Sequence, residues 1–140
     1  ATEINEEIFA EVNYHAAYEP QRTVRTQRYR YIRRYDRRTS PVLPNCDNSP
    51  SKAVWMENGW KERTPPEEAL YDLIFDPVEV NNLAQQAEMA DVLNDMRGRL
   101  DRWMQRTDDP LLEGTVPAPP GARINDADGI SANEPAKEAK

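Results

Sequence analysis

Residues 86–106, QAEMADVLNDMRGRLDRWMQR, carry the strongest structural signal in the chain. Large apolar side chains recur there at spacings of three and four, which places them on one face of an α-helix: Met89, Val92, Leu93, Met96, Leu100 and Trp103. Arginines and aspartates fill the other positions and predict a solvated opposite face. Asp109 and Pro110 mark the end of this segment. The stretch therefore predicts a long amphipathic helix with one face on a core.

The residues that precede this helix predict strands. Across residues 4–18 apolar and polar side chains alternate with a period of two, which is typical of a half-buried strand. We expect Pro20 to end this strand, because proline lacks the N–H that a sheet uses. Residues 69–76, ALYDLIFD, predict another strand further along the chain.

A hairpin is predicted between these two strands. Residues 22–36 are rich in β-branched and aromatic side chains, which favour the pleated surface of a sheet. We expect two strands there, at about 22–26 and 29–36, joined by a tight turn near Gln27. The turn contains no glycine, so its position rests on the spacing of the strands alone.

Two proline positions predict short helices. Ser49–Pro50 fits the N-cap and first position of a helix that ends near Gly59. Asp76–Pro77 with Glu79 resembles a capping box that opens a second short helix. Capping explains Asp76 and Glu79 better than a calcium site, because their spacing matches no complete calcium loop.

Together these elements predict an α+β fold. A small antiparallel sheet of about four strands would have one face covered by the long helix. We expect residues 1–112 to form this subdomain and residues 113–140, which are rich in proline, to form an extended or partly disordered tail. No run of about 18 apolar residues predicts a membrane-spanning helix. The chain begins with Ala1 and shows no signal peptide, so we expect it to be part of a longer polypeptide.

Cysteine and histidine are too few for several kinds of site. A single cysteine, Cys46, excludes an internal disulfide and an all-cysteine metal site. A single histidine, His15, excludes His–His metal motifs and argues against a complete catalytic triad. We therefore expect Cys46 to be a free thiol rather than a nucleophile.

Basic charge is concentrated in one segment. Residues 20–40 hold eight arginines and one aspartate, a net charge of +7, whereas the whole chain carries −7. Guanidinium groups bind sulfate, phosphate or carboxylate in a bidentate manner, and the intervening tyrosines can stack on sugars or bases. Two interpretations remain open: a stand-alone module that binds heparin-like glycans or nucleic acid, or strands whose arginines pair with the acidic remainder.

Two segments resemble the sulfatase family. Residues 70–84, LYDLIFDPVEVNNLA, are similar to the closing signature of that family. Residues 22–32, RTVRTQRYRYI, together with Tyr14–His15 upstream, resemble its C-terminal hairpin. The nearest branch is the heparan N-sulfatase (sulfamidase) group, and the resemblance covers about residues 5–125.

The resemblance implies the C-terminal subdomain of a secreted or periplasmic sulfatase that hydrolyses sulfate esters or sulfamates of saccharides. The implied partners are the N-terminal catalytic domain of the same polypeptide and a sulfated saccharide; a membrane and nucleic acid are not expected. Calcium and the catalytic formylglycine would belong to the catalytic domain. Cys46 is followed by DNSP and does not match the formylglycine motif Cys/Ser-x-Pro-Ser-Arg, so no catalytic or metal-binding residue is carried over to this chain.

Three residues are candidates for substrate contact. In the family the loop that leaves the first strand of this subdomain approaches the catalytic pocket, which makes His15 the leading candidate. Its imidazole could hydrogen-bond a sugar hydroxyl or a sulfate oxygen. Arg22 and Arg25 follow it. The alternative is a purely structural lobe in which His15 lies at a strand end and the arginines are ion-paired.

Overall fold

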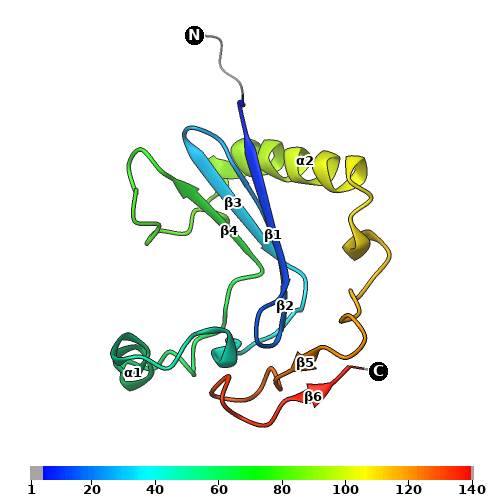
Figure 1. Cartoon of the computed structure of the whole chain (residues 1–140). Coiled ribbons are helices and arrows are strands. Elements are labelled where there is room, and N and C mark those ends of the chain that lie inside the picture. Colours follow the sequence, from blue (N-terminus) through cyan, green and yellow to red (C-terminus); the bar gives the residue numbers. More distant parts are fainter. Residues whose placement is uncertain (1–4, 140) are drawn as a thin grey trace. The chain divides into compact units, whose positions relative to one another are not determined.

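A computed structural model describes residues 5–139 and contains a four-stranded antiparallel sheet (Figure 1). The strands lie in the order β1-β2-β3-β4. Their bounds are β1 (Ile8–Tyr14), β2 (Tyr18–Arg25), β3 (Tyr29–Arg34) and β4 (Glu68–Asp72). The predicted α+β class, the hairpin and its turn between Arg25 and Tyr29 are confirmed.

The long helix α2 (Ala90–Arg106) lies across one face of this sheet (Figure 1). A single turn of 3-10 helix, η2 (Ala87–Met89), leads into it. Its buried residues are Leu93, Met96, Leu100 and Met104. Cross-strand neighbours on the sheet supply the other side of the core, because Val24 pairs with Tyr31 and Tyr31 with Leu70, and all three are fully buried. The apolar periodicity of residues 86–106 therefore predicted the helix and three of its four buried residues, while Met104 was not predicted. Val92 and Trp103, which the periodicity placed on the same face, are only half-buried.

The chain divides into two compact units. The first unit holds residues up to Glu11, Gln21–Arg34 and Glu67–Thr115. It contains α2 and a short 3-10 turn, η3 (Pro110–Leu112). The second unit holds Val12–Pro20, Tyr35–Pro66 and the residues from Val116 onward. The sequence predicted one boundary near residue 112, between a subdomain and a tail. Each of the two units instead combines three separate stretches of the chain, so the predicted boundary stays a prediction.

The second unit has little regular structure. It contains η1 (Leu43–Asn45), α1 (Pro50–Glu57) and two short paired strands, β5 (Arg123–Ile124) and β6 (Lys137–Glu138). The prediction of α1 is confirmed: the Ser49 side chain accepts a hydrogen bond from Lys52 N, and Gly59 follows the helix with φ +77°. The residues after Val116 contain turns and little regular structure, and two short segments of them pair as β5 and β6.

The sheet begins differently from the prediction. The single strand expected over 4–18 is wrong, because β1 ends at Tyr14 and β2 already begins at Tyr18. Pro20 lies inside β2 and is buried rather than ending a strand. Its carbonyl still accepts a hydrogen bond from Tyr35 N at 3.0 Å, so the missing proline N–H removes only one bond near the end of the ladder.

The segment after β4 also departs from the prediction. The strand ends at Asp72 rather than residue 76, because Asp72 Oδ1 accepts from Ile74 N and turns the chain. The short helix expected from Asp76 is absent from this segment. Asp76 does cap backbone N–H groups, as its position predicted, but it holds a turn in which Glu79 adopts φ +56°. A residue with a positive φ is incompatible with an α-helix.

Candidate functional site

His15 lies in the tight turn between β1 and β2, and its side chain is exposed. The turn is held by Asn45, whose Oδ1 accepts from Ala16 N at 2.9 Å and from Ala17 N at 2.7 Å. The Asn45 amide also donates to Ala17 O and to Glu19 Oε2, at 3.2 and 2.8 Å. One side chain therefore fixes the backbone that presents His15. The role of Asn45 could not be predicted from the sequence, since a contact across 28 residues leaves no local pattern.

Arg22 is enclosed in the first unit, with its side chain 0% exposed. Its Nε donates to Asp109 Oδ2 at 2.5 Å and its Nη2 to Asp109 Oδ1 at 2.9 Å, while Nη1 donates to Gln21 O. Burial by itself would raise the pKa of Asp109, but hydrogen bonds from Arg22 and Leu111 N and the Arg22 charge together lower it. This geometry favours the structural alternative for Arg22, whose contact with a substrate stays a prediction.

Arg25 lies at the end of β2 on the opposite face from Arg22 and is exposed. The alternation of side chains along a strand separates the two arginines, because they are three residues apart. Arg25 therefore remains open to a ligand, and it pairs in register with Arg30 on β3. The structure therefore does not bring the three candidates together: Arg22 and Arg25 lie on opposite faces of β2, and His15 belongs to the other unit.

Most of the remaining arginines of the hairpin segment face carboxylates of this chain. Among the described residues, at least five of the eight arginines in 20–40 form ion pairs: Arg22 with Asp109, Arg28 with Asp72, Arg30 with Glu79, Arg33 with Asp101 and Arg38 with Asp128. Paired guanidinium groups offer little attraction to a polyanion. The arrangement favours the interpretation in which these arginines meet the acidic remainder.

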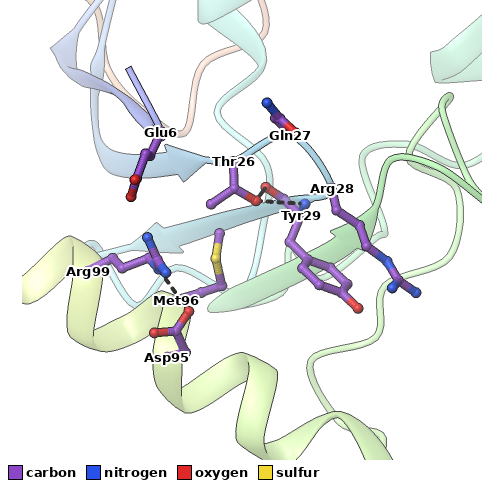
Figure 2. Close-up of a pocket in the computed structure, with 8 residues that line it drawn as sticks. All are labelled: Glu6, Thr26, Gln27, Arg28, Tyr29, Asp95, Met96 and Arg99. Carbon is purple, nitrogen blue, oxygen red and sulfur yellow. Dashed lines mark hydrogen bonds and ion pairs between the residues drawn. The ribbon is translucent and has the colours of Figure 1, made fainter. Parts of the chain in front are cut away.

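A shallow hollow of about 330 Å³ opens beside the β2–β3 turn (Figure 2). Its lining residues come from the turn, from α2 and from the residues before β1: Glu6, Thr26, Gln27, Arg28, Tyr29, Asp95, Met96 and Arg99. Arg99 is held by Asp95 at 2.8 Å and by Glu7 at 2.7 Å, and Arg28 pairs with Asp72 at 2.8 Å. The charges are thus balanced within the chain. The hollow offers polar groups and one aromatic ring, but no nucleophile paired with a base.

The described residues contain no cluster of side chains that could bind the calcium implied by the family resemblance. Across residues 5–139 no three His, Cys, Asp or Glu side chains gather closely enough to hold a metal ion. Cys46 is a half-buried free thiol at the end of η1. In the same part of the chain, no helix is long and apolar enough to cross a bilayer.

The fold and these side chains describe a small α+β subdomain. No protein-family model matches the chain. An ulvan-active sulfatase from Formosa agariphila is 31% identical over 117 residues, which cover 83% of this chain and 21% of that relative. The chain is thus similar to sulfatases and corresponds to a sulfatase C-terminal subdomain. It spans only about a fifth of this relative's length.

Solved structures show the same fold. A putative sulfatase from Bacteroides thetaiotaomicron matches 96% of this chain and 24% of its own, with a TM-score of 0.58 and 23% identity. A 2-O GAG sulfatase matches 93% of this chain and 24% of its own, with a TM-score of 0.56 and 23% identity. The sheet, the long helix and the tail are thus a recurring part of larger sulfatases.

Proposed function

We propose that this chain is the C-terminal part of an enzyme that hydrolyses sulfate esters or sulfamates of saccharides. In this proposal it packs on an N-terminal catalytic domain of the same polypeptide and forms one wall of the substrate pocket. The support comes from the match to an ulvan-active sulfatase over 83% of the chain and from the fold shared with a GAG sulfatase. Calcium and formylglycine would be supplied by the catalytic domain, and the enzyme would be periplasmic or secreted. The sulfamidase branch stays a prediction.

The observation that carries the pocket role is the His15 turn. Asn45 uses both ends of its amide to fix Ala16 and Ala17, which holds an exposed imidazole in a defined place. Side chains that bind a substrate are most effective when their backbone is already fixed. Arg25 is the second candidate, because it is exposed, whereas Arg22 is enclosed.

The test is the kinetics of His15→Ala in the full-length polypeptide with a sulfated saccharide. A hydrogen bond to a charged sulfate contributes about 1.5–3 kcal/mol, so kcat/KM is expected to fall about tenfold to a hundredfold. Gln27→Ala is the matched control, because Gln27 is also exposed in a tight turn of the same sheet. Unchanged kcat and KM in His15→Ala would support the purely structural lobe instead.

A further inference from the structure

One turn of the first unit exposes an unusual amount of apolar surface. It follows β4 and loops away from the sheet before the chain returns to α2 (Figure 1). We call residues 73–80 the Phe75 turn. Four of its large apolar side chains are mostly exposed: Ile74 at 63%, Phe75 at 80%, Val78 at 76% and Val80 at 74%. Single exposed apolar residues are common, but four within seven residues form a patch that indicates an interaction site.

The backbone of the Phe75 turn is fixed by polar contacts rather than by burial of these side chains. Asp72 Oδ1 accepts from Ile74 N at 3.1 Å, and Asp76 Oδ2 accepts from Asn81 N at 2.7 Å. Arg30 Nη1 donates to both oxygens of Glu79, at 2.9 and 2.8 Å.

Glu79 itself adopts φ +56°, a left-handed conformation that costs a glutamate free energy. Carboxylates therefore hold this strained turn in shape while its apolar side chains face outward. Such an arrangement is suited to binding a partner surface.

The charges around the patch limit what that partner can be. Arg28 lies 5.6 Å from the centre of the Phe75 ring, but its guanidinium is paired with Asp72 at 2.8 Å. Arg30 is likewise paired with Glu79. The patch therefore presents apolar side chains beside neutralised ion pairs. A sulfated polysaccharide or an anionic lipid surface would need unpaired cations, whereas a protein surface of matching apolar character would not.

We propose that Ile74, Phe75, Val78 and Val80 form the surface on which the catalytic domain of the same polypeptide docks. This inference rests on the proposed function. The curated relative is nearly five times as long as the segment it shares with this chain, since the match covers 21% of it, so most of such a protein lies outside these residues. Contacts between domains of one chain bury about 600–1,500 Å², and an exposed phenylalanine flanked by aliphatic residues is a suitable centre for such an area.

Photo-crosslinking in the full-length polypeptide tests the surface directly. p-Benzoylphenylalanine replaces Phe75 in one sample and Asp91, an exposed residue at the start of α2, in a matched control. After irradiation we expect position 75 to join peptides that precede Ala1 in the same polypeptide, with at least tenfold more product than position 91. Crosslinks to a second copy, equal yields at both positions, or no crosslink from position 75 would overturn the proposal.

A substitution provides the second measurement. In the full-length polypeptide, Phe75→Ser should speed proteolytic cleavage between the catalytic domain and this subdomain about tenfold. The reason is that burial of a phenylalanine side chain at the docking surface contributes more than the 1.4 kcal/mol that a tenfold change requires. Leu112→Ser is the control, since Leu112 is 54% exposed in the same unit but lies outside the turn. An unchanged cleavage rate in Phe75→Ser would contradict the proposal.

Sulfatase turnover, measured on the same samples, separates the two proposals. Turnover without the crosslink would reject the docking surface alone. The crosslink without turnover on any sulfated saccharide would reject the proposed function and leave the docking surface in place.

Discussion

The two units of this chain are stabilised in different ways. The first unit has a continuous apolar core, in which Val24, Tyr31 and Leu70 on the sheet face the buried side of α2. The second unit buries few large apolar residues and relies on side chains that hydrogen-bond backbone groups. A regular core can therefore be predicted from apolar periodicity, whereas a unit built from loops depends on individual polar side chains.

Charged pairs reinforce the core of the first unit. Arg97 Nε donates to Glu68 Oε1 at 2.7 Å, and the Tyr31 hydroxyl also donates to Glu68. The hydrogen bond from Arg97, more than the one from Tyr31, lowers the pKa of Glu68. Burial and the contact with Glu68 raise the pKa of Tyr31. These groups link α2 to the sheet through a carboxylate that must be ionised.

In the second unit the corresponding role belongs to Lys52. Its side chain is buried, and Nζ donates to Leu43 O at 2.8 Å, Cys46 O at 2.8 Å and Ile130 O at 2.6 Å. The ammonium therefore satisfies three backbone carbonyls from two segments that are far apart in sequence. Unlike Glu68, these acceptors do not titrate.

Acidification should produce the largest change, because it acts on several pairs of the first unit at once. The pKa values of Glu68, Asp72 and Asp109 are lowered in the folded state. Their stabilisation is therefore complete above the ordinary carboxyl pKa of about 4 and is lost as the pH falls through the lowered values. Hydrogen-exchange pulses at one fixed pH, after equilibration between pH 6 and pH 2, should show the first unit losing protection before the residues around Lys52.

The Glu68→Gln variant is the control for the acid experiment. It removes one titrating group, so its protection should depend less steeply on pH below 4. If the residues around Lys52 lose protection before the first unit, acid does not act mainly on the ionised carboxylates, and the proposed difference between the two units is wrong.

Asp109→Asn should cause the largest loss among single substitutions. It removes the buried carboxylate that binds the Arg22 guanidinium at two nitrogens, and breaking a buried ion pair costs about 3–5 kcal/mol. The half-exposed carboxylate of Glu11, 3.4 Å from Arg22 Nε, offsets part of that cost. The free energy of unfolding in urea measures the loss. Asp108→Asn is the matched control, because Asp108 is exposed and its φ of +50° suits asparagine. Recovery of part of the stability in Arg22→Met with Asp109→Asn would assign the cost to the buried charge.

The same contrast explains how much the sequence could predict. Periodicity identified α2 and all of its buried residues except Met104, and the composition of 22–36 identified the β2–β3 hairpin, because both signals are local. The partner of Arg22 could not be predicted, since Asp109 is 87 residues away. At the candidate site the sequence predicted a continuous strand across His15, which lies instead in the turn between β1 and β2. The Asn45 side chain that holds this turn comes from a distant part of the sequence, so no local pattern predicted it.

Lys52→Met should destabilise the second unit by about 2–3 kcal/mol, since three carbonyls lose their donor and each unsatisfied buried group costs about 1–3 kcal/mol. Water that reaches some of these carbonyls offsets part of the sum. Hydrogen exchange should increase near Cys46 and around Ile130. Lys61→Met, at an exposed position, should change stability by less than about 0.5 kcal/mol. Unchanged exchange around Ile130 would show that the tail is held by other contacts.

Phe9→Leu should have the smallest effect, about 1 kcal/mol on the first unit. The Phe9 and Trp103 rings are stacked with centroids 5.1 Å apart and planes 3° apart, and such pairs contribute about 0.5–1.5 kcal/mol beyond the area they bury. A double-mutant cycle with Trp103→Leu isolates that coupling from the strand propensity of Phe9. A coupling near zero would mean that the two rings stabilise the contact between β1 and α2 through the area they bury alone. Polar contacts such as the ion pair between Arg97 and Glu68 would then account for the specific way in which α2 packs on the sheet.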